Sequence, residues 1–223
     1  MRNCCIIVAG GAGLRMGTAL PKQFLPLLKI PVLMHTIRKF YNYDPTLQII
    51  LVLPRNEIPK WEYLCSKHTF KISHQVIAGG ETRFQSVKNG LSLALECELI
   101  AIHDGVRPLV SYATIENCFH CATKNGTAIP VVPANESIRQ GSLDESVSVD
   151  RSRYFMVQTP QVFKSSIIRT SYDQLFDQAL TDDASVVEKA GFKVSLVTGN
   201  RENIKITFPE DVKIAELLLR DKE

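Results

Sequence analysis

Glycines and two cations cluster close to the start of the chain. Residues 10–13 read Gly-Gly-Ala-Gly, and Arg15 and Lys22 follow them. Glycine tolerates positive φ and lets a ligand approach the backbone N–H groups. Such N–H groups cradle phosphate oxygens, while Arg and Lys neutralise the phosphate charge. The stretch therefore predicts a triphosphate-binding loop.

Two common phosphate-loop patterns do not match this stretch. A Walker A loop needs a glycine followed by Lys and then Ser or Thr, and no such pair stands at that spacing. The dinucleotide fingerprint needs G-x-G-x-x-G, whereas Gly11, Gly13 and Gly17 are spaced one residue wider, with Arg15 among them. A glycine turn without a ligand stays open as an alternative, but it leaves the two cations unexplained.

A carboxylate follows the buried strand predicted over residues 99–103. Asp104 stands at the carboxyl end of that strand, where open parallel sheets bind their ligands. Magnesium usually takes one or two carboxylates together with substrate phosphates. Asp104 is therefore the predicted Mg²⁺ ligand, and the neighbouring His103 is expected to be structural.

A second glycine turn precedes another predicted helix. Gly80, Thr82 and Arg83 fall at the helix N-terminus, where free backbone N–H groups favour polar or anionic ligands, and Ser86 lies one turn further in. The residues alone equally allow a simple glycine turn with a Thr cap.

These residues have to be positioned by alternating strands and helices. Apolar runs predict strands over residues 4–9, 48–53, 74–78, 99–103, 126–133 and 194–197. Helices are predicted over residues 32–43, 57–68, 83–95, 111–125, 164–179 and 184–190, and from Pro209 to about residue 219. The alternation predicts an α/β fold with a mainly parallel sheet, formed by residues 1–223 as a single domain. Trp61 is placed on a surface helix without a role.

The composition narrows the class of protein. The chain has 223 residues, 45% of them hydrophobic and 22% charged, and its net charge of +3 does not indicate nucleic-acid binding. The early apolar run is too short for a signal peptide or a membrane span, so we expect a cytoplasmic protein. Its six cysteines are then reduced thiols. Cys118 and Cys121 are expected to be core and surface residues of one helix rather than metal ligands.

Several short motifs together resemble a known family. The opening V-A-G-G-A-G-L-R-M-G and P-K-Q, and the later G-G-x-x-R-x-x-S, H-D-x-x-R-P and Q-T-P-Q, occur in order along the chain. They resemble nucleotidyltransferases of sugar phosphates, and more narrowly the cytidylyltransferases that act on 2-C-methyl-D-erythritol 4-phosphate. The resemblance implies a three-layer α/β sandwich, Rossmann-like, with a protruding β-arm. It also implies CMP transfer from CTP to a sugar-alcohol phosphate in non-mevalonate isoprenoid precursor synthesis, with D-ribitol 5-phosphate as the alternative acceptor.

The resemblance assigns roles residue by residue. Arg15, Lys22, Arg151 and Lys205 are the implied catalytic residues, and Asp104 is the implied Mg²⁺ ligand. The implied nucleotide-binding residues are Ala9, Gly10, Gly11, Gly13, Gly80, Glu81, Arg83, Ser86 and Gly105. The implied substrate-binding residues are Arg107, Ser137, Arg151, Thr159 and Lys205. Glu136 and Ser137 stand where the family usually has an Asp-Thr pair, so the hydroxyl is kept.

The polar segment over residues 134–157 is long for a connection inside one domain. In the resembled family it forms an arm that embraces a second subunit, which predicts a homodimer, whereas composition alone equally allows a mobile loop.

The acceptor phosphate is mostly a dianion at pH 7, so its attack needs charge stabilisation and positioning rather than a general base. Two other classes stay open. A nucleotide-sugar glycosyltransferase would usually carry an Asp-x-Asp motif, and a non-catalytic protein would bind CTP without turning it over.

Overall fold

A parallel sheet forms the centre of the molecule. The structure is a computed structural model that describes residues 2–10 and 20–220. The first strand, β1 (Arg2–Val8), lies between β4 (Gln48–Leu53) and β6 (Cys97–Asp104), and β5 (Gln75–Ala78) continues the sheet beyond β4. All of these pairs are parallel, so their carboxyl ends meet at one edge.

The sheet continues beyond β6 with strands of mixed direction. The strand β11 (Gln161–Lys164) is antiparallel to both β6 and β7 (Thr127–Pro133), and β10 (Phe155–Val157) is antiparallel to β7. The strand β12 (Leu196–Thr198) pairs with β7 in parallel. The sequence did not predict β11, because four residues are too few to show a periodicity.

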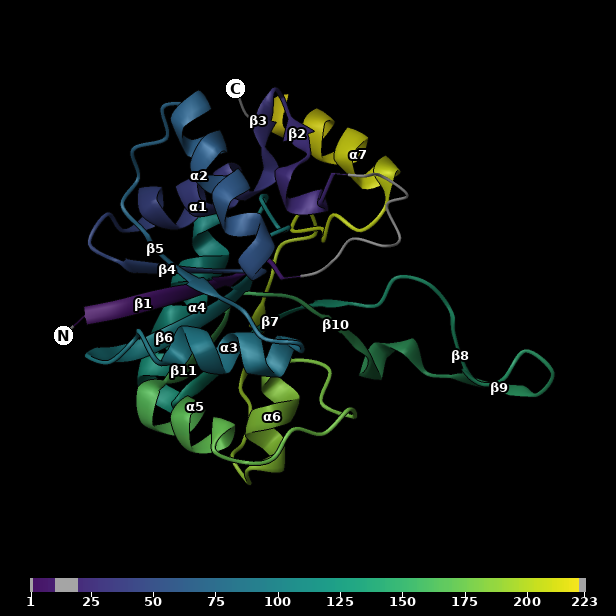
Figure 1. Cartoon of the computed structure of the whole chain (residues 1–223). Coiled ribbons are helices and arrows are strands. Elements are labelled where there is room, and N and C mark those ends of the chain that lie inside the picture. The colour runs from purple at the N-terminus through teal and green to yellow at the C-terminus, as the bar shows by residue number, and fades with distance from the viewer. Residues whose placement is uncertain (1, 11–19, 221–223) are drawn as a thin grey trace.

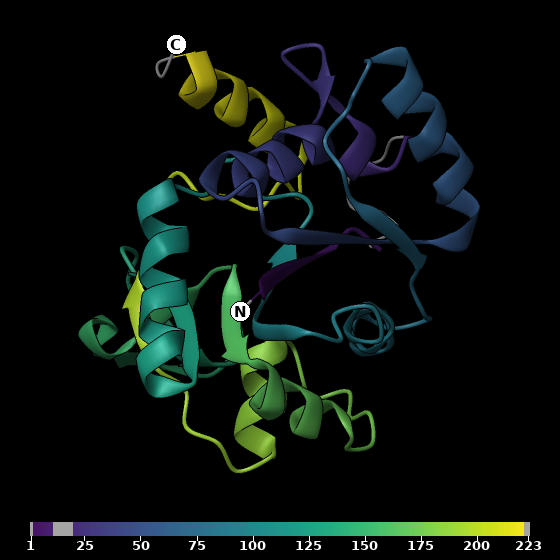
Figure 2. The same cartoon turned by 90° about the vertical axis from the view of Figure 1, so that its left-hand side faces the viewer.

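Helices cover both faces of this sheet, as the two views in Figures 1 and 2 show. The helices α1 (Val32–Tyr43), α2 (Ile58–Lys67) and α4 (Tyr112–Asn125) pack on one face, and α3 (Arg83–Leu91), α5 (Ser165–Tyr172) and α6 (Asp183–Lys189) on the other. The last helix, α7 (Pro209–Arg220), packs near the short hairpin of β2 (Pro26–Leu27) and β3 (Ile30–Pro31). Short 3-10 helices occur at Lys22–Phe24, Arg55–Glu57 and Arg151–Arg153. The predicted three-layer α/β fold is confirmed.

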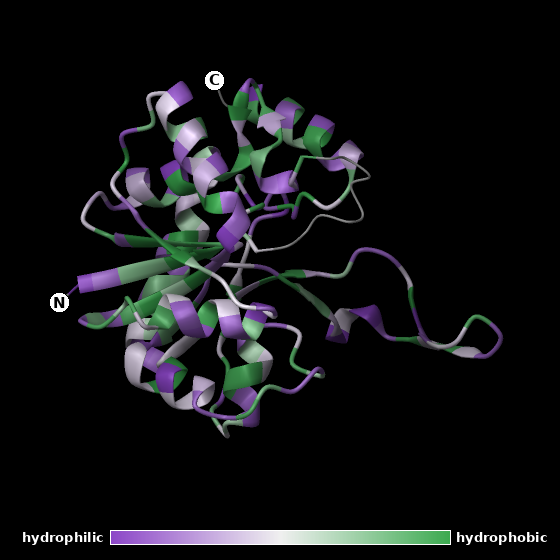
Figure 3. Ribbon diagram, viewed as in Figure 1, coloured by the Kyte–Doolittle hydropathy of each residue, from purple (hydrophilic) through white to green (hydrophobic). Residues whose placement is uncertain are grey.

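The apolar run of β1 explains its central place. Cys5 and Ile7 point into the core beneath α1, whereas Cys4 and Ile6 point into the core beneath α3, and all four are fully buried. A strand covered on both faces has no polar side to alternate with, so it is apolar throughout. Figure 3 shows this apolar character along the central strands.

Several predicted boundaries were wrong. The helix α5 ends at Tyr172 rather than at residue 179, and α3 ends at Leu91 rather than at residue 95. Residues 203–207, which match a strand motif of the resembled family, form no regular strand. The placement of Trp61 on the surface was also wrong, because its side chain is 1% exposed. The indole ring stacks on Phe24, with ring centroids 6.3 Å apart, and its N–H donates to His74 Nε2 at 2.9 Å.

The segment after β7 leaves the body of the protein. The strands β8 (Ile138–Gly141) and β9 (Ser146–Val149) pair into an antiparallel hairpin that projects far from the sheet (Figure 1). This confirms a protruding β-arm. Within the described ranges, no helix has the length and apolar character needed to cross a membrane.

Candidate active site

Three loops leave the same edge of the sheet. Val8 is level with Val52 on one side and with Asp104 on the other, so β1, β4 and β6 end together. Backbone bonds extend this alignment by one residue, because Ala9 N–H donates to Val52 at 2.9 Å and Gly105 N–H donates to Val8 at 2.9 Å. The predicted loops therefore face one another.

A cavity of about 390 Å³ lies between these loops. Its lining contains many of the residues that the sequence singled out: Ala9, Gly10, Lys22, Gly80, Glu81, Arg83, Ser86, Asp104 and Lys205. Val8, Gln23, Thr82 and Val106 complete it. Gln23 was missed by sequence reasoning, although its amide donates to the carbonyl of Ala9 at 3.0 Å and so ties the Lys22 turn to the end of β1.

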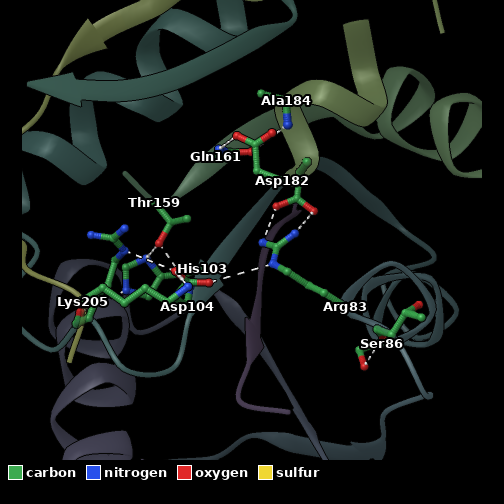
Figure 4. Close-up of polar contacts among 12 residues, drawn as sticks. Arg83, Ser86, His103, Asp104, Thr159, Gln161, Asp182, Ala184 and Lys205 are labelled. Carbon is green, nitrogen blue, oxygen red and sulfur yellow. Dashed lines mark hydrogen bonds and ion pairs between the residues drawn. The ribbon is translucent and has the colours of Figure 1, made fainter. Parts of the chain in front are cut away.

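Asp104 lies at the centre of a cationic cluster (Figure 4). Its Oδ2 lies 3.0 Å from Lys205 Nζ and 3.2 Å from Arg107 Nε, and its Oδ1 lies 4.0 Å from Arg83 Nε. Burial raises the pKa of Asp104, but the charges of Lys205, Arg83 and Arg107 outweigh burial and hold that pKa well below its usual range. The carboxylate thus stays charged and anchors cations at the pocket.

His103 and Thr159 support Asp104 from behind. The Thr159 hydroxyl accepts from the backbone N–H of Asp104 at 3.1 Å and bonds His103 Nδ1 at 3.0 Å, while His103 Nε2 lies 3.1 Å from the carbonyl of Arg107. Burial lowers the pKa of His103 to about 4, so the ring is neutral, in agreement with a structural role. Thr159, predicted to bind substrate, is 5% exposed and is not among the residues lining the cavity.

Lys205 reaches the pocket on a segment held by distant residues. The Arg107 guanidinium donates to the carbonyl of Asn203 at 2.7 Å, and the Asn203 side chain donates to the carbonyl of Thr159 at 2.8 Å. Asn203 is fully buried. Sequence reasoning missed its role, because the family motif over residues 203–207 assigns a function only to Lys205.

The N-terminus of α3 is built around the second glycine turn. Thr82 accepts from Gln85 N–H at 3.1 Å as the helix N-cap. Ser86 donates to the carbonyl of Thr82 at 2.9 Å and accepts from Gly80 N–H at 3.2 Å (Figure 4). A Cβ on Gly79 would lie 2.7 Å from the Ser86 hydroxyl, so this close approach requires glycine.

Other predicted residues fall outside the described ranges or do not line the cavity. Gly11, Gly13 and Arg15 are outside the described residues. Ser137 and Arg151 are exposed residues of the arm region, away from the cavity lining, and an Arg151 terminal nitrogen contacts the carbonyl of Asn135. Gly105 is buried against the end of β1, where an added Cβ would lie 2.8 Å from the Cβ of Ala9. Close packing therefore explains why residue 105 is a glycine.

The site fits a Mg²⁺ ion that takes most of its ligands from substrate phosphates and water, and few from the protein. Among the described residues, no group of three or more His, Cys, Asp or Glu side chains gathers into a cage. Asp104 offers one carboxylate, and among residues 2–10 and 20–220 its Oδ1 makes the longer contact, of 4.0 Å, with Arg83. Mg²⁺ typically needs few protein oxygens when substrate phosphates and water supply the rest.

Comparison with known proteins adds a family context. A family model described as 2-C-methyl-D-erythritol 4-phosphate cytidylyltransferase matches residues 3–221. A protein of that name from Bacteroides thetaiotaomicron is 52% identical over 98% of this chain and 100% of its own length.

Solved structures agree with this match. The cytidylyltransferase structure from Thermus thermophilus has a TM-score of 0.80 at 28% identity, covering 99% of this chain and 100% of that one. The 4-diphosphocytidyl-2C-methyl-D-erythritol synthase structure from Anaerococcus prevotii has a TM-score of 0.81 at 27% identity, covering 98% of each chain.

Proposed function

The chain belongs to the 2-C-methyl-D-erythritol 4-phosphate cytidylyltransferase family, and from this premise we propose how its pocket works. The protein transfers CMP from CTP to 2-C-methyl-D-erythritol 4-phosphate, giving 4-diphosphocytidyl-2-C-methyl-D-erythritol and pyrophosphate in isoprenoid precursor synthesis. The comparisons give no support to the ribitol phosphate alternative.

The reaction brings an anion up to a triphosphate. The acceptor phosphate attacks the α-phosphorus of CTP, the bond from the α-phosphorus to the bridging oxygen breaks, and pyrophosphate leaves with its electron pair. No proton has to be removed from the acceptor, since its second pKa is near 6. The barrier is therefore mainly electrostatic, and fixed cations lower it most when they face the charge that develops.

The observation that supports this mechanism best is the cluster of cations around one carboxylate at the edge of the sheet. We propose that Lys22, which lines the cavity and is 9% exposed, stabilises the triphosphate and the pentacoordinate transition state. Lys205, with 42% of its side chain exposed, holds the acceptor phosphate for in-line attack. The glycine turns at Gly10 and Gly80 supply close backbone approach for the nucleotide.

A divalent ion, Mg²⁺ by preference, is proposed to accompany the CTP phosphates. When bound, it would neutralise phosphate charge and polarise the reacting phosphoryl group. Asp104 is the residue that would face it. The low pKa of Asp104 supports this role, because the carboxylate stays ionised near neutral pH.

We further propose a homodimer formed through the arm and the neighbouring edge of the sheet. Phe155, Met156 and Val157 of β10 are each 46–59% exposed, an unusual amount of apolar side chain for one short strand. A dimer also accounts for Arg151, which the family motif assigns to the substrate although it lies away from its own pocket. The six free cysteines support a reducing, cytoplasmic location.

The function is tested by pyrophosphate release with CTP and Mg²⁺. We expect turnover with 2-C-methyl-D-erythritol 4-phosphate and none with D-ribitol 5-phosphate. Turnover of ribitol phosphate alone would contradict the assigned acceptor, and CTP binding without turnover of either would indicate a non-catalytic protein. Chelation of the metal by EDTA is expected to abolish release, and added Mg²⁺ to restore it.

A further inference from the structure

A buried ion pair lies directly behind the pocket. Arg83 donates from Nη1 to Asp183 Oδ1 at 2.8 Å and from Nη2 to Asp183 Oδ2 at 2.6 Å. The Tyr172 hydroxyl donates to the same Oδ1 at 2.6 Å. Asp183 is fully buried, whereas 30% of the Arg83 side chain is exposed toward the pocket. One end of this pair is thus fixed and the other forms part of the cavity wall.

The paired carboxylate decides how Arg83 is oriented. Both terminal nitrogens donate one N–H each to Asp183, so the end-on fork of the guanidinium is occupied and cannot grip a phosphate. Its Nε lies 4.0 Å from Asp104 Oδ1 instead (Figure 4). Burial opposes the charge of Arg83, but Asp183 and Asp104 more than compensate and raise its pKa. Arg83 is therefore a permanent cation with a fixed direction.

Asp183 is itself rigidly placed. It is the first residue of α6, whose N-cap Asp182 accepts from Ser185 N–H at 2.9 Å. Gln161 of β11 fastens this turn to the sheet, because it donates to Asp182 Oδ2 at 2.8 Å and accepts from Ala184 N–H at 2.8 Å (Figure 4). The N-terminus of α6 is thus anchored to the strand that pairs with β6, the strand carrying Asp104.

The helix α3 is held to α5 near both of its ends. Near its N-terminus, Phe84 stacks on Tyr172 with ring centroids 4.6 Å apart. Near its C-terminus, Arg169 of α5 donates to the carbonyl of Leu91 at 3.0 Å and also to that of Ala94. These contacts fix the helix whose first turn faces the cavity.

We propose that Asp183 is a positioning residue for the nucleotide pocket, acting through Arg83 on the affinity for CTP. Sequence reasoning treated residues 181–183 as a connection between two helices. The inference rests on the proposed function, since it requires the cavity to be the CTP site. The opposing view is that the pair only stabilises the fold, as buried ion pairs often do when one partner is removed.

Steady-state kinetics of Asp183→Asn separate the two views. Asn keeps the shape of the side chain but accepts only one of the two guanidinium bonds, so Arg83 is free to turn toward Asp104. We expect the KM for CTP to rise about tenfold, while kcat and the KM for the acceptor change by less than about threefold. A purely structural role would lower the folded, active fraction and thus the apparent kcat, and leave the KM for CTP unchanged, which would overturn the proposal.

Val187→Ala is the matched control. It removes two methyl groups from a fully buried residue of the same helix and costs about 1–3 kcal/mol of stability, but it leaves the Asp183 turn and its contacts with Gln161 in place. We expect a lower melting temperature with an unchanged KM for CTP. An equal rise in KM for this variant would show that loosening α6 is sufficient, which would also overturn the proposal.

A double-variant cycle tests whether Asp183 acts through Arg83. In the Arg83→Gln background, adding Asp183→Asn should change the KM for CTP by less than about twofold, because the residue it positions is gone. Independent effects that multiply would contradict the proposal. In the double variant both side chains are neutral, so neither Arg83 nor Asp183 is left as a buried charge without its partner. If Asp183→Asn alone does not fold, Tyr172→Phe replaces it in the cycle, with an expected KM rise of about threefold.

The wild-type protein distinguishes this inference from the function on which it rests. If the proposed function is wrong, the wild-type protein will release no pyrophosphate from CTP with the proposed acceptor. Failure of the inference would appear as an active wild type whose KM for CTP does not respond to Asp183→Asn.

Discussion

Lys22 illustrates how the fold places the charge that we propose stabilises the transition state. It lies on the short 3-10 helix after the glycine loop, it is 9% exposed, and its neighbour Gln23 ties that turn to Ala9 at the end of β1. A cation held in a partly dry cavity faces phosphate charge with little reorganisation, and this makes it more effective than a cation in water.

Replacing Lys22 by Ala is therefore expected to lower kcat by roughly 10² to 10³, the scale of losing one preorganised contact to developing charge. Pyrophosphate release at saturating CTP and acceptor measures it. The control is Lys71→Ala, which removes an exposed lysine that does not line the cavity. A rise in KM with an unchanged kcat would show that Lys22 binds substrate and transition state equally.

At the scale of elements, α3 carries Arg83 and Ser86 of the cavity lining and packs closely on the sheet. Gly90 makes this approach possible: a Cβ there would lie 2.6 Å from Ile6 Cγ2 and 3.2 Å from Val52 Cγ2. Both neighbours are fully buried, on β1 and β4. A larger residue at position 90 would push α3 away from the sheet. The separation of Arg83 on α3 from Asp104 on β6 therefore depends on this glycine.

Gly90→Ala is expected to destabilise the protein although alanine favours helices. The helix propensity gained is up to about 1 kcal/mol, whereas overpacking a buried contact costs about 1–3 kcal/mol. We expect a net loss of about 1–2 kcal/mol in the free energy of unfolding, measured by urea titration. Lys88→Ala, on the exposed side of the same helix, should stay within about 0.5 kcal/mol. An increase in stability for Gly90→Ala would mean that α3 shifts outward without cost.

The whole molecule presents two separate regions, a compact sandwich with the pocket and an arm that projects from it (Figure 1). The predicted acceptor residues are divided between them, with Lys205 at the pocket and Arg151 on the arm side. In the proposed homodimer, two-fold symmetry would let each arm serve the other subunit.

Mixing two inactive variants tests this arrangement. The Arg151→Ala variant and the Lys205→Ala variant, each assayed alone, should release almost no pyrophosphate. If Arg151 acts across the interface, half of a random mixture is heterodimer with one intact site, so about a quarter of wild-type activity should return. A mixture of Lys205→Ala with Lys22→Ala, both lining the same pocket, should not recover. No recovery in the first mixture would place Arg151 in the site of its own subunit or outside any site.

The sequence by itself determined the elements whose signals are local. The helix at Val32–Tyr43 and the strand at Gln48–Leu53 were predicted to the residue, because apolar periodicity and the proline after the strand act over a few positions. The alternation of strands and helices predicted the fold, and the ordered series of short motifs predicted the family and most of the residues that line the cavity. The contacts made by Gly11, Gly13 and Arg15 stay predictions, since these residues lie outside the described ranges.

Only the tertiary structure decided which distant side chains meet. Asp104 gathers charges from positions 83, 107 and 205, and Arg83 finds its carboxylate a hundred residues away at Asp183. The burial of Trp61 and the insertion of β11 beside β6 likewise depend on neighbours far along the chain. Burial and ion pairing are properties of packed surfaces, and packing brings together residues that no local pattern connects.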